Sequence, residues 1–312
     1  MKLLRLVPAG LRVPFMQFHK VAVSISAALL VASAVLLFTN GLNFGIDFRG
    51  GTLIEIETAT APDLGRVRDE LNSLGLGDIS LQEFGAANDL LIRMALLPGD
   101  EAVQQVAVDQ VQDALNLMFP GIEYRRVEFV GPQVSGELIE KGTQAVLVAI
   151  LLMMVYIWLR FEWQFGVGAV IALVHDVGLT IGLFCLFQID FGLPVVAALL
   201  TIVGYSMNDT VVVYDRIREN LRKFKQESML AIIDRSLSDT LSRTIMTSVT
   251  TLLALAALYV FGGEVIAPFV LAMIWGVLVG TYSSLFVAAP LLLYVKPVRN
   301  FNDEDDKDET PA

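Results

Sequence analysis

The chain has 312 residues, 55% of them hydrophobic and 18% charged, and its mean hydropathy of +0.63 is too high for an ordinary soluble domain. The net charge of −11 comes from a few polar segments, so it does not indicate a nucleic-acid surface. One cysteine and two histidines exclude a disulfide framework and a zinc centre of the usual kind. The chain also lacks a Gly-x-x-x-x-Gly-Lys loop for ATP hydrolysis. Composition therefore predicts an integral membrane protein.

The first part of the chain is a basic segment followed by an apolar run. Residues 1–20 mix basic and apolar side chains, which predicts a cytoplasmic N-terminal segment that lies partly on the membrane surface. Residues 21–38 are expected to form the first transmembrane helix. A cleaved signal peptide is the alternative, because Ala32-Ser33-Ala34 resembles a cleavage site, but this site lies inside the apolar run.

The only long polar block covers residues 40–140. Alternating and helical spacings of its apolar residues predict strands at 53–58, 78–84, 90–96 and 122–130 and helices at 63–74 and 100–118. The order β-α-β-β-α-β is that of a ferredoxin-like split unit. We therefore expect an extracytoplasmic (periplasmic) α+β domain of ferredoxin-like type between transmembrane helices 1 and 2.

Five further apolar runs follow the polar block within residues 142–295. They lie at about 142–159, 164–188, 194–214, 244–261 and 267–295, so the expected fold is an α-helical polytopic membrane protein with six transmembrane helices. Lysine and arginine collect in the loop 215–243, and such loops stay cytoplasmic. Both termini are then cytoplasmic as well, and the acidic tail 296–312 is expected to be solvated.

Polar residues interrupt three of the apolar runs. His175 and Asp176 lie in the third expected helix, Asn208 and Asp209 in the fourth, and Arg243 at the start of the fifth. Intramembrane ionisable groups are costly and mark ion or proton pathways. At about 1.5 Å of rise per residue, Asp176, Asp209 and Arg243 lie at successive depths less than one helical turn apart. If the three helices are neighbours, the side chains can meet as a carboxylate–guanidinium cluster.

Each of these residues also has a purely structural interpretation. Asp209 could hold helices together, His175 and Asp176 could be packing residues, and Arg243 could be a positive anchor at the cytoplasmic surface. We expect Asp215 and Arg216 to form a charge pair at the end of the fourth helix. The spacings Gly178-x-x-x-Gly182 and Gly276-x-x-x-Gly280 are typical of closely approaching helices.

A glycine-rich string, FGIDFRGGT, occupies residues 44–52 directly after the first apolar run. Gly45, Gly50 and Gly51 permit a tight backbone where the chain enters its first strand. Asp47 and Arg49 could pair locally. Structural coupling of the domain to the membrane is one interpretation of this string, and direct contact with a substrate is the other.

These strings together resemble the SecD/SecF family of protein-export membrane proteins, and its SecF branch in particular. The resemblance rests on residues 44–52, on His175-Asp176, on GYSMNDTVVVYDRIREN at 204–220 and on SRTIMT at 242–247, and it covers nearly the whole chain. It implies a subunit that pairs with SecD beside the SecYEG channel, with YajC and YidC as further candidate partners. The resemblance also implies that the proton gradient, or sodium in some members, drives export of unfolded polypeptides across the bacterial inner membrane. The family's ion-linked aspartate and arginine map onto Asp209 and Arg243.

Three functions are candidates for a chain with these features. The first is a non-enzymatic, proton-driven subunit that acts on polypeptides and needs no bound cofactor. The second is half of a small-molecule efflux transporter of the resistance-nodulation-division superfamily, to which the resemblance also assigns the chain, since such transporters pair two repeats. The third is an intramembrane aspartyl protease built on Asp176 and Asp209. The protease reading lacks a Gly-x-Gly-Asp string at either aspartate, and the small outer domain disfavours efflux.

Overall fold

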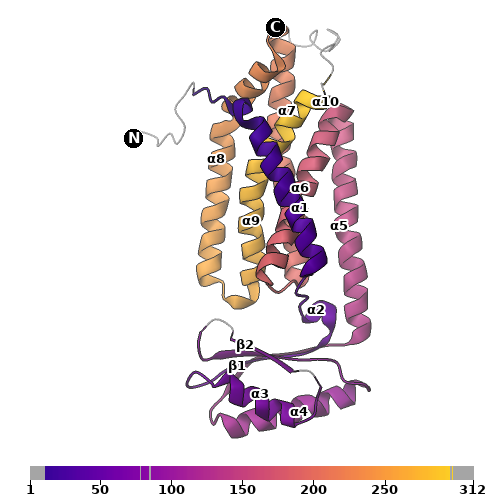
Figure 1. Cartoon of the computed structure of the whole chain (residues 1–312), viewed down its shortest axis with the longest axis vertical. Coiled ribbons are helices and arrows are strands. Elements are labelled where there is room, and N and C mark those ends of the chain that lie inside the picture. Colours follow the sequence, from indigo (N-terminus) through magenta and orange to yellow (C-terminus); the bar gives the residue numbers. More distant parts are fainter. Residues whose placement is uncertain (1–10, 78, 84–85, 296, 298–312) are drawn as a thin grey trace, which may run out of the picture.

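A computed structural model describes residues 11–77, 79–83, 86–295 and 297, and it places a small sheet domain at one end of a helical bundle (Figure 1). The sheet has the order β2-β3-β1-β4, and every neighbouring pair is antiparallel. Its strands are β1 (Gly51–Glu57), β2 (Ile79–Glu83), β3 (Asp89–Met94) and β4 (Glu123–Val130). Helices α3 (Leu64–Ser73) and α4 (Glu101–Met118) cover the face that points away from the bundle (Figure 1). The expected ferredoxin-like domain is confirmed.

Alternation along the strands explains the two faces of this sheet. On β1, Ile54 and Ile56 are fully buried in a core shared with Val111 of α4. The residues on either side of Ile54 point to the opposite face, where Leu53 and Glu55 border a cavity beside the ends of the bundle helices. One face therefore makes the domain's own core, and the other meets the membrane part of the molecule.

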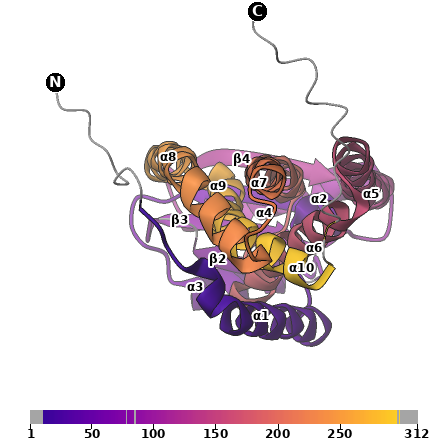
Figure 2. The same ribbon diagram turned by 90° about the horizontal axis from the view of Figure 1, so that it is seen from above.

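The part of the chain that the structure describes contains six helices long and apolar enough to cross a membrane. They are α1 (His19–Thr39), α5 (Pro132–Arg160), α6 (Trp163–Phe187), α7 (Leu193–Lys223), α8 (Met229–Phe261), and a last helix built from α9 (Ala267–Ser283), η3 (Ser284–Ala288) and α10 (Ala289–Val295). Helices α6, α7 and α9 are largely buried, whereas α1, α5 and α8 lie at the periphery (Figure 2). Short helices η1 (Phe15–Phe18), α2 (Ile46–Arg49) and η2 (Glu264–Ile266) complete the described elements.

The glycine spacings allow the close helix contacts that we expected. A Cβ atom at Gly182 would lie 2.1 Å from Ser33 Oγ of α1, and one at Gly276 would lie 2.3 Å from Ile202 Cγ1 of α7. The absence of a side chain at Gly182 lets α6 pack directly on α1, and its absence at Gly276 lets α9 pack directly on α7.

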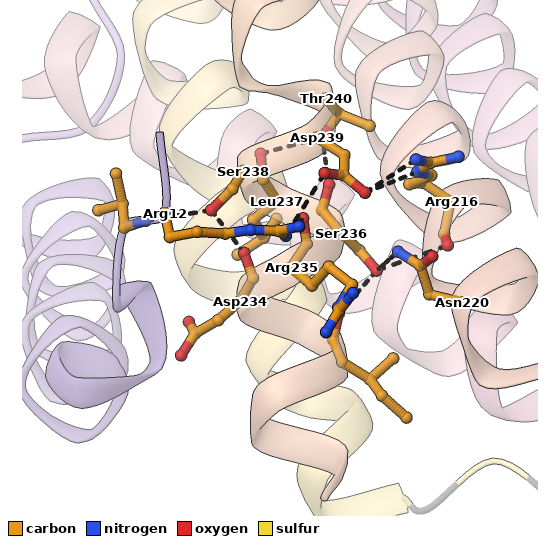
Figure 3. A network of polar contacts seen from close by, with 12 residues as sticks. Arg12, Arg216, Asn220, Asp234, Arg235, Ser236, Leu237, Ser238, Asp239 and Thr240 are labelled. Atoms are coloured by element: carbon orange, nitrogen blue, oxygen red, sulfur yellow. Dashed lines mark hydrogen bonds and ion pairs between the residues drawn. The ribbon is translucent and has the colours of Figure 1, made fainter. Parts of the chain in front are cut away.

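Two expected boundaries were wrong. Helix α5 begins at Pro132, inside the block 40–140, and the loop 215–243 is mostly helical, since only residues 224–228 separate α7 from α8. Hydropathy detects the apolar core of a helix and misses polar extensions that pack on each other. Here Arg216 of α7 binds Asp239 of α8 at 2.8 Å, and Asn220 donates to Ser236 at 2.9 Å (Figure 3). The N-terminal residues 1–10 and the tail 296–312, apart from Pro297, lie outside the described residues.

The N-terminal segment also packs on the extension of α8. The backbone N–H of Val13 donates to Ser238 Oγ at 3.1 Å, and that of Met16 donates to Asp234 at 2.8 Å. Arg12 reaches Asp239 at 3.5 Å, so this carboxylate contacts arginines from two segments (Figure 3). The segment expected to lie partly on the membrane surface is therefore tied, from Arg12 to Met16, to a neighbouring helix.

Candidate functional site

Asp176, near the middle of α6, is fully buried. Its Oδ2 accepts hydrogen bonds from Ser206 Oγ of α7 at 2.5 Å and from Ser283 Oγ of α9 at 2.7 Å. Its Oδ1 lies 2.9 Å from His175 Nδ1. Three helices thus meet at one carboxylate, and an adjacent imidazole can carry a proton to or from it.

Asp209 of α7 is the second buried carboxylate, with 9% of its surface exposed. Its Oδ1 accepts from Thr244 Oγ1 of α8 at 2.7 Å, and its Oδ2 accepts from Ser284 Oγ at 2.8 Å. Among the described residues, no cation forms an ion pair with Asp209, so hydroxyl groups alone satisfy its oxygens.

The two carboxylates are linked through consecutive residues of the last helix. Ser283 ends α9 and binds Asp176, whereas Ser284 begins the π-helical turn η3 and binds Asp209. Single π turns inside α-helices occur frequently at functional sites. Helices α6, α7, α8 and the last helix therefore build one polar site in the bundle interior.

The expected carboxylate–guanidinium cluster is not formed. Arg243 is exposed, and within the described residues its guanidinium makes no ion pair, while the next residue, Thr244, faces Asp209. Asn208 is exposed as well. One step along a helix turns a side chain by roughly 100°, and depth along the membrane does not reveal this angle.

The expected Asp215–Arg216 pair was also wrong, because consecutive residues on a helix do not face each other. Asp215 lies 3.3 Å from Arg160 of α5, and Arg216 binds Glu219 at 2.6 Å in addition to Asp239. The Asp215–Arg160 and Arg216–Asp239 pairs tie α7 to α5 and to α8 at the end of the bundle away from the sheet, whereas Glu219 lies on α7 itself.

The glycine-rich segment 44–52 joins the domain to the bundle. Gly50 and Gly51 have φ angles of 70° and 115°, and a Cβ atom at Gly51 would lie 2.2 Å from the carbonyl oxygen of Met94. Both positions therefore require glycine. The backbone N–H of Gly45 donates to the Phe191 carbonyl at 3.0 Å, so the segment is attached to the turn between α6 and α7.

Asp47 and Arg49 do not pair with each other among the described contacts. Asp47 Oδ2 accepts from the backbone N–H of Leu193, the first residue of α7, at 2.8 Å, and a carboxylate there stabilises the start of a helix. Arg49 is exposed.

A second polar contact between domain and bundle is the ion pair of Arg93 on β3 with Asp190, just before α7. Asp190 also accepts from Asn43 Nδ2 at 2.9 Å. Burial, and then the charge of Arg49, lower the pKa of Arg93 from its usual value.

The sequence reasoning missed Ser206, Ser283 and Ser284. A signal was present, since Ser206 lies in the polar string 204–220 and a pair of adjacent serines interrupts the last apolar run. Hydroxyl side chains in helices often bond the backbone of their own helix, however, as Thr201 and Thr250 do. Their number therefore does not identify which of them face a carboxylate.

Fold and site together define a polytopic membrane protein of transport type, with ionisable groups inside a six-helix bundle and a ferredoxin-like domain attached to it. Residues 110–298 match the family model "Protein export membrane protein SecD/SecF, C-terminal", and residues 35–62 match the SecD/SecF GG motif. The chain belongs to the SecD/SecF family of protein-export membrane proteins.

Relatives and solved structures agree with this assignment. The chain is 48% identical to the protein translocase subunit SecF of Rickettsia rickettsii over 96% of each chain. It is 46% identical to that of Desulfurispirillum indicum, over 91% of this chain and 92% of the relative. The crystal structure of SecDF, a translocon-associated membrane protein from Thermus thermophilus, matches with a TM-score of 0.82 and 34% identity. That match covers 91% of this chain and only 39% of the SecDF chain.

Proposed function

We propose that this chain is a SecF-like subunit that works with SecD and uses the proton gradient to promote polypeptide export through the SecYEG channel. The observation that carries the proposal is the hydroxyl-lined carboxylate Asp209. The relatives' shared name, protein translocase subunit SecF, favours export over small-molecule efflux.

The hydrogen bonds around the carboxylates suit a group that gains and loses a proton. A hydroxyl can donate to a carboxylate and can accept from a carboxylic acid. Ser284 Oγ lies 3.0 Å from the Thr281 carbonyl as well as 2.8 Å from Asp209, and Ser283 Oγ lies 3.1 Å from the Gly280 carbonyl. After protonation of the aspartates, each serine can turn its hydrogen to that carbonyl and accept the acid proton. In both states the carboxyl groups and the serine hydroxyls keep hydrogen-bond partners.

Two exposed polar side chains, Asn208 of α7 and Arg243 of α8, support a second membrane subunit as partner. Asp209 and Thr244 meet between two antiparallel helices, and Asn208 and Arg243 each precede them by one residue. In antiparallel helices that step turns both side chains toward the same side of the pair. Exposed Asn208 and Arg243 are costly against lipid, so we infer that SecD covers this side and brings groups to Arg243.

The proposed location is the bacterial inner membrane, with both termini cytoplasmic. Arg216, Arg222 and Lys223 lie near the end of α7 that is remote from the sheet domain, and positive charge favours the cytoplasmic side. The sheet domain at the other end is then periplasmic (Figure 1).

The test replaces Asp209 by asparagine in membrane vesicles that carry the complete export machinery. Asp209→Asn cannot ionise, so we expect co-purification with SecD to persist and gradient-dependent stimulation of export to fall to the level of vesicles without the subunit. Asp69→Asn is the control, because it makes the same change at an exposed position of α3 that forms no ion pair among the described residues. Imposing a proton or a sodium gradient separately identifies the coupling ion. Full gradient-dependent export by the Asp209→Asn protein would refute the proposal.

A further inference from the structure

Two cavities lie where the sheet domain joins the bundle. The first, of about 470 Å³, has Arg49, Ser80 and Arg93 in its wall. The second, of about 290 Å³, runs between α5, α6 and α7. Phe44 of the glycine-rich segment borders both, so the two cavities are adjacent.

The first cavity is cationic. The described residues that line it include two arginines and no acidic side chain. Arg49 is exposed and forms no ion pair within the described part of the chain. Arg93 is engaged by Asp190 outside the cavity wall, but its buried Nε–H has no acceptor among the described residues. The cavity thus offers guanidinium donors that carboxylate or phosphate groups match well.

The second cavity is an apolar groove on a membrane-spanning part of the bundle. Gly142 and Val146 of α5 face Ile181 of α6 and Leu199 of α7 across it. Leu147 of α5, also in its wall, is 61% exposed, so the groove borders the surroundings of the bundle. For helices that cross a membrane, these surroundings are lipid chains.

A charged pocket and an apolar groove on the two sides of Phe44 together have the layout of a phospholipid. We propose that this junction binds an anionic phospholipid, whose phosphate contacts Arg49 and Arg93 and whose acyl chain fills the groove beside Gly142. The bound lipid would lie against α2, the helix that carries Asp47 and Arg49 between domain and bundle. This lipid site includes neither the buried carboxylates Asp176 and Asp209 nor the exposed pair Asn208 and Arg243.

The test is native mass spectrometry of the full-length protein in detergent, titrated with phosphatidylglycerol and with zwitterionic phosphatidylcholine. Arg49→Gln is expected to weaken phosphatidylglycerol binding roughly fivefold, the effect of one arginine near an anionic surface, and to reduce the preference over phosphatidylcholine. Gly142→Leu fills the groove and is expected to weaken binding of both lipids. Arg66→Gln, an exposed change on α3, is the matched control and should bind as the unchanged protein does.

Equal phosphatidylglycerol affinity in Arg49→Gln, Gly142→Leu and Arg66→Gln would overturn the proposal. A photo-crosslinking amino acid at Leu147 provides a second measurement in exporting membranes. Adducts with phospholipid mass support the proposal, whereas adducts with the translocating polypeptide alone would show that the groove serves another ligand.

Discussion

Replacing Gly276 by alanine tests whether direct α7–α9 packing holds the site together. The added methyl group would lie 2.3 Å from Cγ1 and 2.4 Å from Cδ1 of Ile202, a side chain that is only 1% exposed. Overpacking of this kind costs about 1–3 kcal/mol. The strain pushes α9 away from α7, and α9 leads into Ser283 and Ser284. Export should therefore decrease together with stability.

A double-mutant cycle with Ile202→Ala isolates this contact. Ile202→Ala alone removes the clashing atoms and leaves a cavity, at a cost of about 2–5 kcal/mol. In the double variant, the methyl group of residue 276 occupies part of that cavity. We therefore expect Gly276→Ala to cost nothing further in the Ile202→Ala background, which corresponds to a coupling energy of about 1–3 kcal/mol.

The measurement is equilibrium unfolding of the detergent-solubilised protein, followed by tryptophan fluorescence, for the unchanged chain, both single variants and the double variant. If the two single costs add to within about 0.5 kcal/mol, the residues act independently. That outcome would refute the claim that the absent Cβ of Gly276 sets the distance between α7 and α9.

Two further predictions concern the sheet domain and its attachment. Asp47→Ala removes the acceptor for the Leu193 N–H and should lower the free energy of unfolding by about 1 kcal/mol. Asp47→Asn keeps an acceptor and should lower this free energy by less. Equal losses in denaturant titrations of the two variants would show that Asp47 does not cap α7. Burial, and then the charge of Asp113, raise the pKa of the Tyr124 phenol above its usual 10.0, so the folded state disfavours the ionised form and stability is lost as pH rises from the unfolded pKa through the folded one. Tyr124→Phe should flatten that alkaline loss in unfolding titrations across a pH series, and an unchanged slope would contradict the assignment.

The sheet domain could be predicted because its pattern is local. Short apolar runs bounded by turns mark the strands of the polar block, and α3 begins after Asp63, whose side chain accepts from the N–H groups of Gly65 and Arg66. Elements of this kind depend on neighbours within a few residues, so their order and type follow from the chain itself. The helix boundaries near residues 132 and 224 did not follow, because tertiary contacts extend those helices beyond their apolar cores.

The candidate site could be predicted only in part. Carboxylates in apolar runs identified Asp176 and Asp209, and helical rise placed them at similar depth. The hydrogen-bond partners of these two carboxylates depend on the direction in which each side chain points around its helix axis. Helix packing determines that direction. Arg243 and Thr244 are adjacent in the sequence, and only the structure shows that the threonine faces Asp209. The contribution of Ser283 and Ser284 from the last helix required knowing that α9 packs against α7.

The serine pair of the last helix has a mechanical consequence. One peptide bond separates the hydroxyl that holds Asp176 from the hydroxyl that holds Asp209. A rotation or a shift of the π turn must displace both hydroxyls in the same movement, because a single backbone segment carries them. The two carboxylates are thus coupled through this backbone segment. A change of charge at either aspartate that moves the segment also changes the hydrogen bond of the other aspartate.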